Sequence, residues 1–151
     1  MTTTVLILAI STLLCIFGTA FFVSAETALI SSDKIFLEKK RKSGAHSAAL
    51  ALKHLENLDY LLSTTQFGAN LFLAAATTLA TISIGKLEES HGFGWFAIFA
   101  PVMLVFSDSL PKVLGRSFPE RISLWSSLPL WIFGRIFTPV LGLLALYTIR
   151  L

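Results

Sequence analysis

The sequence predicts an all-α integral membrane protein with three transmembrane helices and cytoplasmic juxtamembrane amphipathic helices. Of its 151 residues only 14% are charged, against roughly a quarter in soluble domains, and the mean hydropathy is +0.75. Apolar segments cover about residues 5–25, 60–85 and 93–114, and each is long enough to cross a hydrocarbon core of roughly 30 Å. Lipid is therefore the solvent of most of this chain, which we treat as one domain, residues 1–151.

The first predicted span ends at an acidic residue. Small residues along it offer faces for close helix packing: Ser11, Thr12, Gly18, Thr19 and Ala20. No Lys or Arg precedes the span, so we do not expect a cleaved secretory signal. Glu26 closes the helix, either as an interfacial acid that caps or pairs locally or as a second acid near a cation path.

Residues 32–58 are predicted to form one or two amphipathic helices along the membrane surface. The segment is rich in Lys and Arg, which places it in the cytoplasm by the positive-inside rule. Ser31, Ser32 or Asp33 can cap its start, and Gly44 interrupts it. The basic cluster either contacts anionic lipids or is a solvated cytoplasmic surface.

The second predicted span, residues 60–85, contains no charged residue. Small residues four apart permit close helix contact and suggest a dimer or a tight bundle. These pairs are Ala74/Thr78, Ala76/Ala80 and Thr77/Thr81. Asn70 also lies in this span, where an unpaired amide is costly. It either makes a structural hydrogen bond between helices or binds a cation.

The placement of charge predicts how the chain crosses the membrane. The short loop after the second span carries Glu88 and Glu89 and is expected outside, whereas Lys112 and Arg116 follow the third span and are expected inside. The N-terminus is therefore predicted outside and the C-terminus in the cytoplasm.

Asp108, near the inner end of the third span, is the strongest candidate for a functional residue. A carboxylate in or near hydrocarbon is costly unless it is paired, hydrated or bound to a metal. Ser107 and Ser109 flank it, and Pro111 cannot donate a backbone hydrogen bond, which frees a carbonyl near Ser107. Carboxylate, hydroxyl and carbonyl oxygens are the hard ligands of small cations, so the sequence predicts a cation site at membrane depth.

Residues 120–150 are apolar but interrupted. Pro129, Gly134, Arg135 and Pro139 fall where a straight span would need apolar helix formers. Trp residues prefer the membrane interface, and Trp131 lies in this segment. We therefore expect two short helices along the inner surface.

Other functional classes find no support in the sequence. Cys15 is the single cysteine, and we expect it to pack within the first span. The scattered His46, His54 and His91 are predicted to be surface residues. No zinc pattern, phosphate-binding loop or nucleophile motif is recognisable, so we do not expect an enzyme. No basic surface with interleaved aromatic residues suggests nucleic-acid binding.

Four motifs carry a family resemblance that extends over nearly the whole chain. In order, they are Phe22-Val23-Ser24-Ala25-Glu26-Thr27-Ala28-Leu29, Leu62-Ser63-Thr64 with Gly68-Ala69-Asn70, Asp108-Ser109-Leu110-Pro111-Lys112, and Pro119-Glu120-Arg121. With these motifs the sequence resembles the membrane domain of the CNNM/CorC family, the cyclin M-type magnesium transporters.

The resemblance implies outward transport of Mg²⁺, with Na⁺ as a candidate coupling ion. It implies a homodimer in the plasma membrane or bacterial inner membrane, with three spans per subunit and a cation site open to the cytoplasm. Carried over from the family, the ligands would be Ser24, Ser63, Asn70 and Asp108. Family members usually continue into CBS modules that bind adenine nucleotide, so this chain is either a piece of a longer protein or a stand-alone membrane domain.

The chain departs from the family pattern at the ligands themselves. Asp108 follows Ser107 where the family usually has glutamate after glycine, Ala69 replaces one of two paired asparagines, and a hydroxyl is lost before Glu26. Mg²⁺ requires near-octahedral oxygen coordination and dehydrates reluctantly, so a depleted set would retain more water or prefer another ion. The alternative function is a non-transporting dimeric membrane adaptor or regulator with a degenerate cation site.

Overall fold

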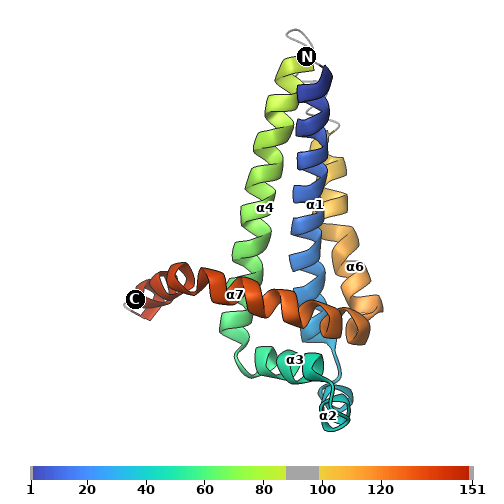
Figure 1. The fold of residues 1–151 in the computed structure, drawn as a ribbon, viewed down its shortest axis with the longest axis vertical. Coiled ribbons are helices and arrows are strands. Elements are labelled where there is room, and N and C mark those ends of the chain that lie inside the picture. Colours follow the sequence, from blue (N-terminus) through green and yellow to red (C-terminus); the bar gives the residue numbers. More distant parts are fainter. Residues whose placement is uncertain (1, 88–98, 150–151) are drawn as a thin grey trace.

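The computed structural model describes residues 2–87 and 99–149, with side chains described for 3–85 and 99–139. Every regular element in these ranges is helical (Figure 1), which confirms the all-α class. The elements are α1 (Thr2–Ser31), α2 (Lys34–Lys42), α3 (His46–Glu56), α4 (Leu58–Leu87), a helix over 99–104, the π-helical turn η1 (Val105–Ser109), α6 (Leu110–Ser117) and α7 (Pro119–Ile149).

Two helices in the described ranges are long and apolar enough to cross a membrane. They cover 29 residues from Thr3 to Ser31 and 28 residues from Leu58 to Gly85, so each is about 42 Å long and exceeds a hydrocarbon core of roughly 30 Å. The prediction that Glu26 closes the first helix is wrong, because α1 continues to Ser31. Its carboxylate meets α4 instead of capping a helix end.

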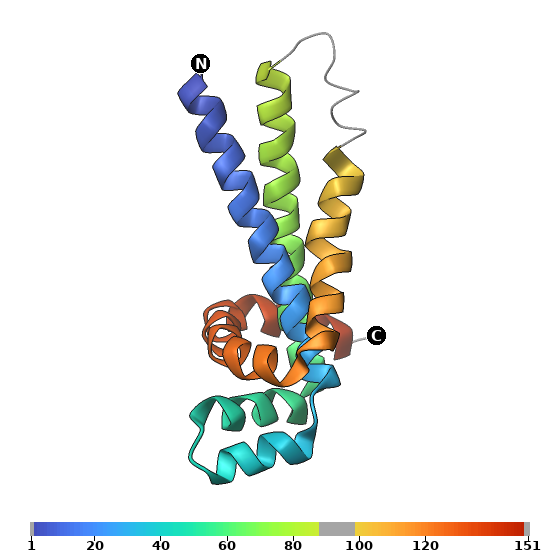
Figure 2. The ribbon, with the colours of Figure 1, turned by 90° about the vertical axis from the view of Figure 1, so that its right-hand side faces the viewer.

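The third predicted span is described only in part. Residues 99–117 form one helical path through η1 and α6, which we call the third helical segment. It packs against α1 (Figures 1 and 2). Residues 93–98, the loop acids Glu88 and Glu89, and His91 lie outside the described residues.

Two glycines set the close approach of α1 to α4. A Cβ built on Gly18 of α1 would lie 2.5 Å from the Phe72 ring, and one on Gly68 of α4 would lie 2.6 Å from the Phe22 ring. Each helix therefore receives an aromatic ring of the other at a glycine, and the two rings stack with centroids 5.9 Å apart. Such contact gives dispersion energy where lipid removes the usual hydrophobic drive for helix association.

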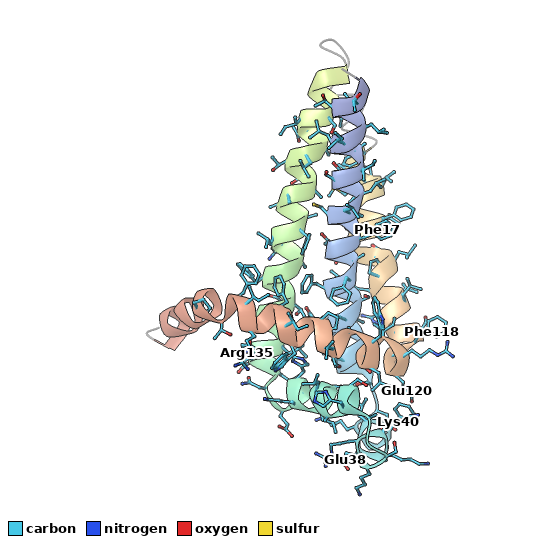
Figure 3. The ribbon with its side chains drawn as sticks, viewed as in Figure 1. Phe17, Glu38, Lys40, Phe118, Glu120 and Arg135 are labelled. Atoms are coloured by element: carbon cyan, nitrogen blue, oxygen red, sulfur yellow. The ribbon has the colours of Figure 1, made fainter. Side chains whose placement is uncertain are left out.

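The core of the described chain lies at the end of the bundle remote from the N-terminus, where α7 runs across the long helices and α2 and α3 pack beneath it (Figures 1 and 2). Its buried members come from α1, α2, α3, α4 and α7: Phe22, Ala25, Leu29, Leu37, Ala51, Leu52, Leu55, Leu61 and Leu130. Apolar residues nearer the N-terminus of α1, such as Phe17 at 70% exposure, face outward (Figure 3), as lipid-facing side chains do.

Residues 34–56 form the two short helices that the sequence allowed. Asp33 caps α2, because its Oδ1 accepts a hydrogen bond from the Ile35 N–H at 2.8 Å. Gly44 adopts a φ of +89° in the turn to α3, a conformation that favours glycine. The charged side chains of Glu38 and Lys40 on α2 lie at the end of the molecule opposite the N-terminus (Figure 3).

Two expectations about the remaining segments are wrong. Residues 120–150 do not form two short helices, since α7 is a single helix with Pro129 and Pro139 inside it. Proline removes one helical donor, and a helix supported by neighbours tolerates the gap. His54 is not a surface residue: it is 6% exposed, and its Nε2 lies 3.2 Å from the Ser127 carbonyl oxygen of α7.

The small-residue pairs of the second span divide between two faces of α4. Ala76 and Ala80 are buried within the chain, on the helix whose main neighbour is α1. The members of the other two pairs, Ala74/Thr78 and Thr77/Thr81, are exposed, so these two pairs remain accessible to a second subunit. The monomer alone thus uses one of the three pairs for its own fold.

Candidate cation site

The helix widens by one residue where it carries Asp108. In η1 the Leu110 N–H donates to the Val105 carbonyl, five residues earlier, and Pro111 follows at the start of α6. Because Pro111 has no N–H, the Ser107 carbonyl lacks its α-helical donor. Single π-helical turns of this kind are frequent at functional sites.

The carboxylate of Asp108 forms an ion pair with the next turn of its own helix. Lys112 Nζ lies 2.8 Å from Oδ1 and 3.0 Å from Oδ2. Both side chains are about half exposed, at 47% for Asp108 and 48% for Lys112. The ammonium group of Lys112 thus lies within reach of both carboxylate oxygens, and a cation bound at Asp108 would have to replace it.

Asp108 and Asn70 meet at one cavity. It has a volume of about 410 Å³, and it lies between α1, α4 and the third helical segment; we call it the Asp108 cavity. Its lining residues are Thr19, Val23, Ala69, Asn70, Leu73, Thr77, Phe99, Ala100, Met103, Leu104, Ser107 and Asp108. Three of the five predicted ligands, Asn70, Ser107 and Asp108, therefore share a cavity although they come from two helices.

Two threonines, Thr19 and Thr77, also line this cavity and were not predicted as ligands. Thr19 Oγ1 donates to the Cys15 carbonyl at 3.1 Å, and Thr77 Oγ1 donates within α4 to Leu73 at 3.0 Å. A hydroxyl whose proton is used by its own helix still has lone pairs to offer a cation. Thr77 lies seven residues after Asn70, hence on the same helix face, and this spacing could have identified it.

The other two predicted ligands lie elsewhere. Ser24 lines a separate apolar cavity of about 680 Å³ with Phe21, Pro111 and Trp125, and its Oγ donates to the Phe21 carbonyl at 3.0 Å. Ser63 is exposed on α4 and lines neither cavity. The structure thus does not bring these two hydroxyls to Asp108.

Glu26 joins α1 to α4 through a hydrogen bond. The hydroxyl of Thr65, which is fully buried, donates to Glu26 Oε2 at 2.5 Å. Glu26 does not line the Asp108 cavity. Of its two interpretations, the structure favours an acid that pairs with a neighbouring helix over one on a cation path.

The Asp108 cavity offers one carboxylate with neutral oxygens. Within the described residues, no three His, Cys, Asp or Glu side chains are close enough to hold a metal ion together. Asp108, the Asn70 amide and the hydroxyls of Thr19, Thr77 and Ser107 are all hard oxygen donors, which suit Mg²⁺ or Ca²⁺ and not thiolate-seeking metals. With a single charged ligand, a bound Mg²⁺ would keep several waters.

Known proteins align with this chain over most of its length. A UPF0053 protein of Haemophilus influenzae is 32% identical over 137 residues, which are 90% of this chain and 33% of that protein. The UPF0053 inner membrane protein YfjD of Escherichia coli is 30% identical over 126 residues, or 83% of this chain and 29% of that protein. A UPF0053 protein of Synechocystis sp. is 27% identical over 134 residues, covering 84% and 37% of the two chains.

The chain spans about a third of the length of these curated relatives. The sequence profile of the cyclin M transmembrane N-terminal domain matches residues 10–150. This range includes most of the first long apolar helix, all of the second, and the residues that line the Asp108 cavity. The chain therefore belongs to the cyclin M (CNNM) transmembrane domain family and is a membrane domain.

Proposed function

We propose that this domain transports a divalent cation, Mg²⁺, through the membrane, with the Asp108 cavity as its binding site. The observation that carries this proposal is the convergence of Asn70, Ser107 and Asp108 on one cavity between three helices. Membership of the cyclin M transmembrane family supports it. Outward transport, coupled to Na⁺, is the direction that the family resemblance favours.

The ion pair of Asp108 suggests how the site exchanges its cation. Lys112 holds the carboxylate when no cation is present, and an arriving Mg²⁺ takes its place. The Ser107 carbonyl, whose α-helical donor position is occupied by Pro111, is a further candidate oxygen on the same turn.

The proposed topology has three spans, with the N-terminus outside and α2, α3 and α7 on the cytoplasmic side. The basic residues of α2 lie at the end of the bundle opposite the N-terminus (Figure 3), which supports this orientation under the positive-inside rule. The proposed assembly is a homodimer, and CBS-type regulatory modules belong to the proposed full-length protein, since relatives are about three times as long as this chain.

The adaptor function remains the second candidate because, among the described residues, Asp108 is the single carboxylate that lines the Asp108 cavity. A site with so little charge could be too weak to load at cellular Mg²⁺ concentrations. In that case the domain would act through dimer contacts and would show no saturable response to Mg²⁺.

A Mg²⁺ titration of thermal stability tests the binding site. At ten times its Kd, a ligand that binds only the folded state stabilises it by about 1.4 kcal/mol, or about 3–6 °C in a domain of this size. We expect this rise in the parent chain and its loss in Asp108→Asn. Asp59→Asn is the matched control, because Asp59 is exposed in the first turn of α4 and does not line the cavity.

A flux measurement separates transporter from adaptor. The purified chain and its Asp108→Asn variant are reconstituted in vesicles that contain a Mg²⁺-sensitive dye. Saturable flux in the parent and none in the variant would support transport through Asp108. Normal flux in the variant would refute the assignment of Asp108. A folded parent chain that shows neither Mg²⁺ flux nor stabilisation by Mg²⁺ would favour the adaptor.

A further inference from the structure

We propose that a second cavity, where α7 crosses α3 and the start of α4, binds the phosphate of an anionic lipid headgroup. The cavity has a volume of about 710 Å³ and shares no lining residue with the Asp108 cavity. This volume lies within the range of small-molecule sites. We call it the headgroup pocket and define it by Lys53, Asn57, Tyr60, Trp131 and Arg135.

Arg135 is the main anchor for an anion. Its guanidinium carbon lies 5.3 Å from the centroid of the Trp131 ring, and its side chain occupies the space between α7 and α3 (Figure 3). Among residues with described side chains, no carboxylate forms an ion pair with it. The ring holds the guanidinium from one face, so its in-plane N–H groups remain free for bidentate contact with a phosphate.

The opposite wall adds a second cation and further donors. Lys53 of α3 lines the pocket, and Glu56 is the acid that lines it, so two cations face one carboxylate. Asn57 Oδ1 accepts from the Tyr60 N–H at 3.2 Å, which leaves the amide N–H groups of Asn57 available. The Tyr60 hydroxyl reaches α7, because a Cβ on Gly134 would lie 2.7 Å from it.

The position of the pocket favours a lipid as the source of the phosphate. Tyr60 lies at the start of the long apolar stretch Leu58–Gly85, and Trp131 faces it from α7. Tyr and Trp concentrate at the level of lipid headgroups, and basic pockets between helices at this level bind anionic headgroups. A soluble phosphate ester would present the same anion, so the experiment must separate the two sources.

The test compares lipids with matched acyl chains in detergent solution. We expect dioleoylphosphatidylglycerol to raise the thermal stability saturably, and dioleoylphosphatidylcholine and glycerol 1-phosphate to leave it unchanged. In Arg135→Gln the apparent affinity for phosphatidylglycerol should fall at least about tenfold. Arg121→Gln should bind like the parent, since Arg121 is an exposed arginine of the same helix that does not line the pocket.

A second variant covers the case in which Arg135→Gln does not fold. Lys53→Gln changes an exposed side chain on α3 and should also weaken phosphatidylglycerol binding, and native mass spectrometry should find less retained lipid. An equal rise with glycerol 1-phosphate would overturn the lipid source and assign the pocket to a soluble phosphate. Equal affinity in the parent, Arg135→Gln and Lys53→Gln would overturn the site itself.

Discussion

Gly115 holds the third helical segment against α1, and adding one methyl group there tests the packing beneath the Asp108 cavity. A Cβ built on Gly115 would lie 2.7 Å from the Ser24 carbonyl oxygen and 3.0 Å from Thr27 Cβ. The first contact is with backbone in the middle of a helix, which cannot rotate away. Gly115→Ala must therefore push the two helices apart.

The expected size follows from two opposing effects. Replacing glycine by alanine in a helix contributes about 1 kcal/mol of stability through propensity, whereas overpacking costs about 1–3 kcal/mol. Gly85→Ala is the matched control, because no described residue lies within 4 Å of a Cβ at Gly85, so we expect the propensity gain alone. The two variants should thus differ by about 1–3 kcal/mol, with Gly115→Ala the less stable.

Thermal unfolding in detergent measures this difference. At about 2–4 °C per kcal/mol for a domain of this size, Gly85→Ala should melt a few degrees above the parent, and Gly115→Ala should melt at or below it. A movement of Asp108, seven residues earlier on the same helix, should also weaken the Mg²⁺ response of Gly115→Ala. The reasoning is refuted if both alanine variants gain the same stability.

Two further predictions concern the core at the end of the bundle remote from the N-terminus. Burial lowers the pKa of His54, Lys53 adds to this effect by repulsion, and the hydrogen bond to the Ser127 carbonyl opposes it. Below pH 6.5 the unfolded chain therefore binds a proton at His54 that the folded chain does not, so the free energy of unfolding should fall as the pH drops below this value. His54→Gln should flatten this dependence of stability on pH. An unchanged slope in the variant would contradict this account. Phe22→Ala should lower the free energy of unfolding by about 3–5 kcal/mol, because Phe22 is 4% exposed and packs between aromatic rings. Phe17 is 70% exposed, so Phe17→Ala should barely change the unfolding temperature. Similar losses of stability in both variants would refute the proposed core.

The sequence by itself predicted the features that depend on neighbours along one helix. The helical class, the two long apolar helices, the short helices after residue 32 and the cap at Asp33 follow from composition, periodicity and local hydrogen bonding. The missing N–H of Pro111 also predicted an irregular backbone near Ser107, although it did not predict the π-helical turn itself.

Only the tertiary structure decided which side chains meet across helices. Spacing along a helix tells which residues share a face. Packing then sets the rotation of each helix about its axis, and this rotation selects the face that is turned to each neighbour. The approach of α1 to α4 through Gly18 and Gly68 leaves Thr19 at the Asp108 cavity and Ser24 at another. The burial of His54 likewise depends on packing between helices. Its ring contacts Ser127 of α7, which lies 73 residues further along the chain.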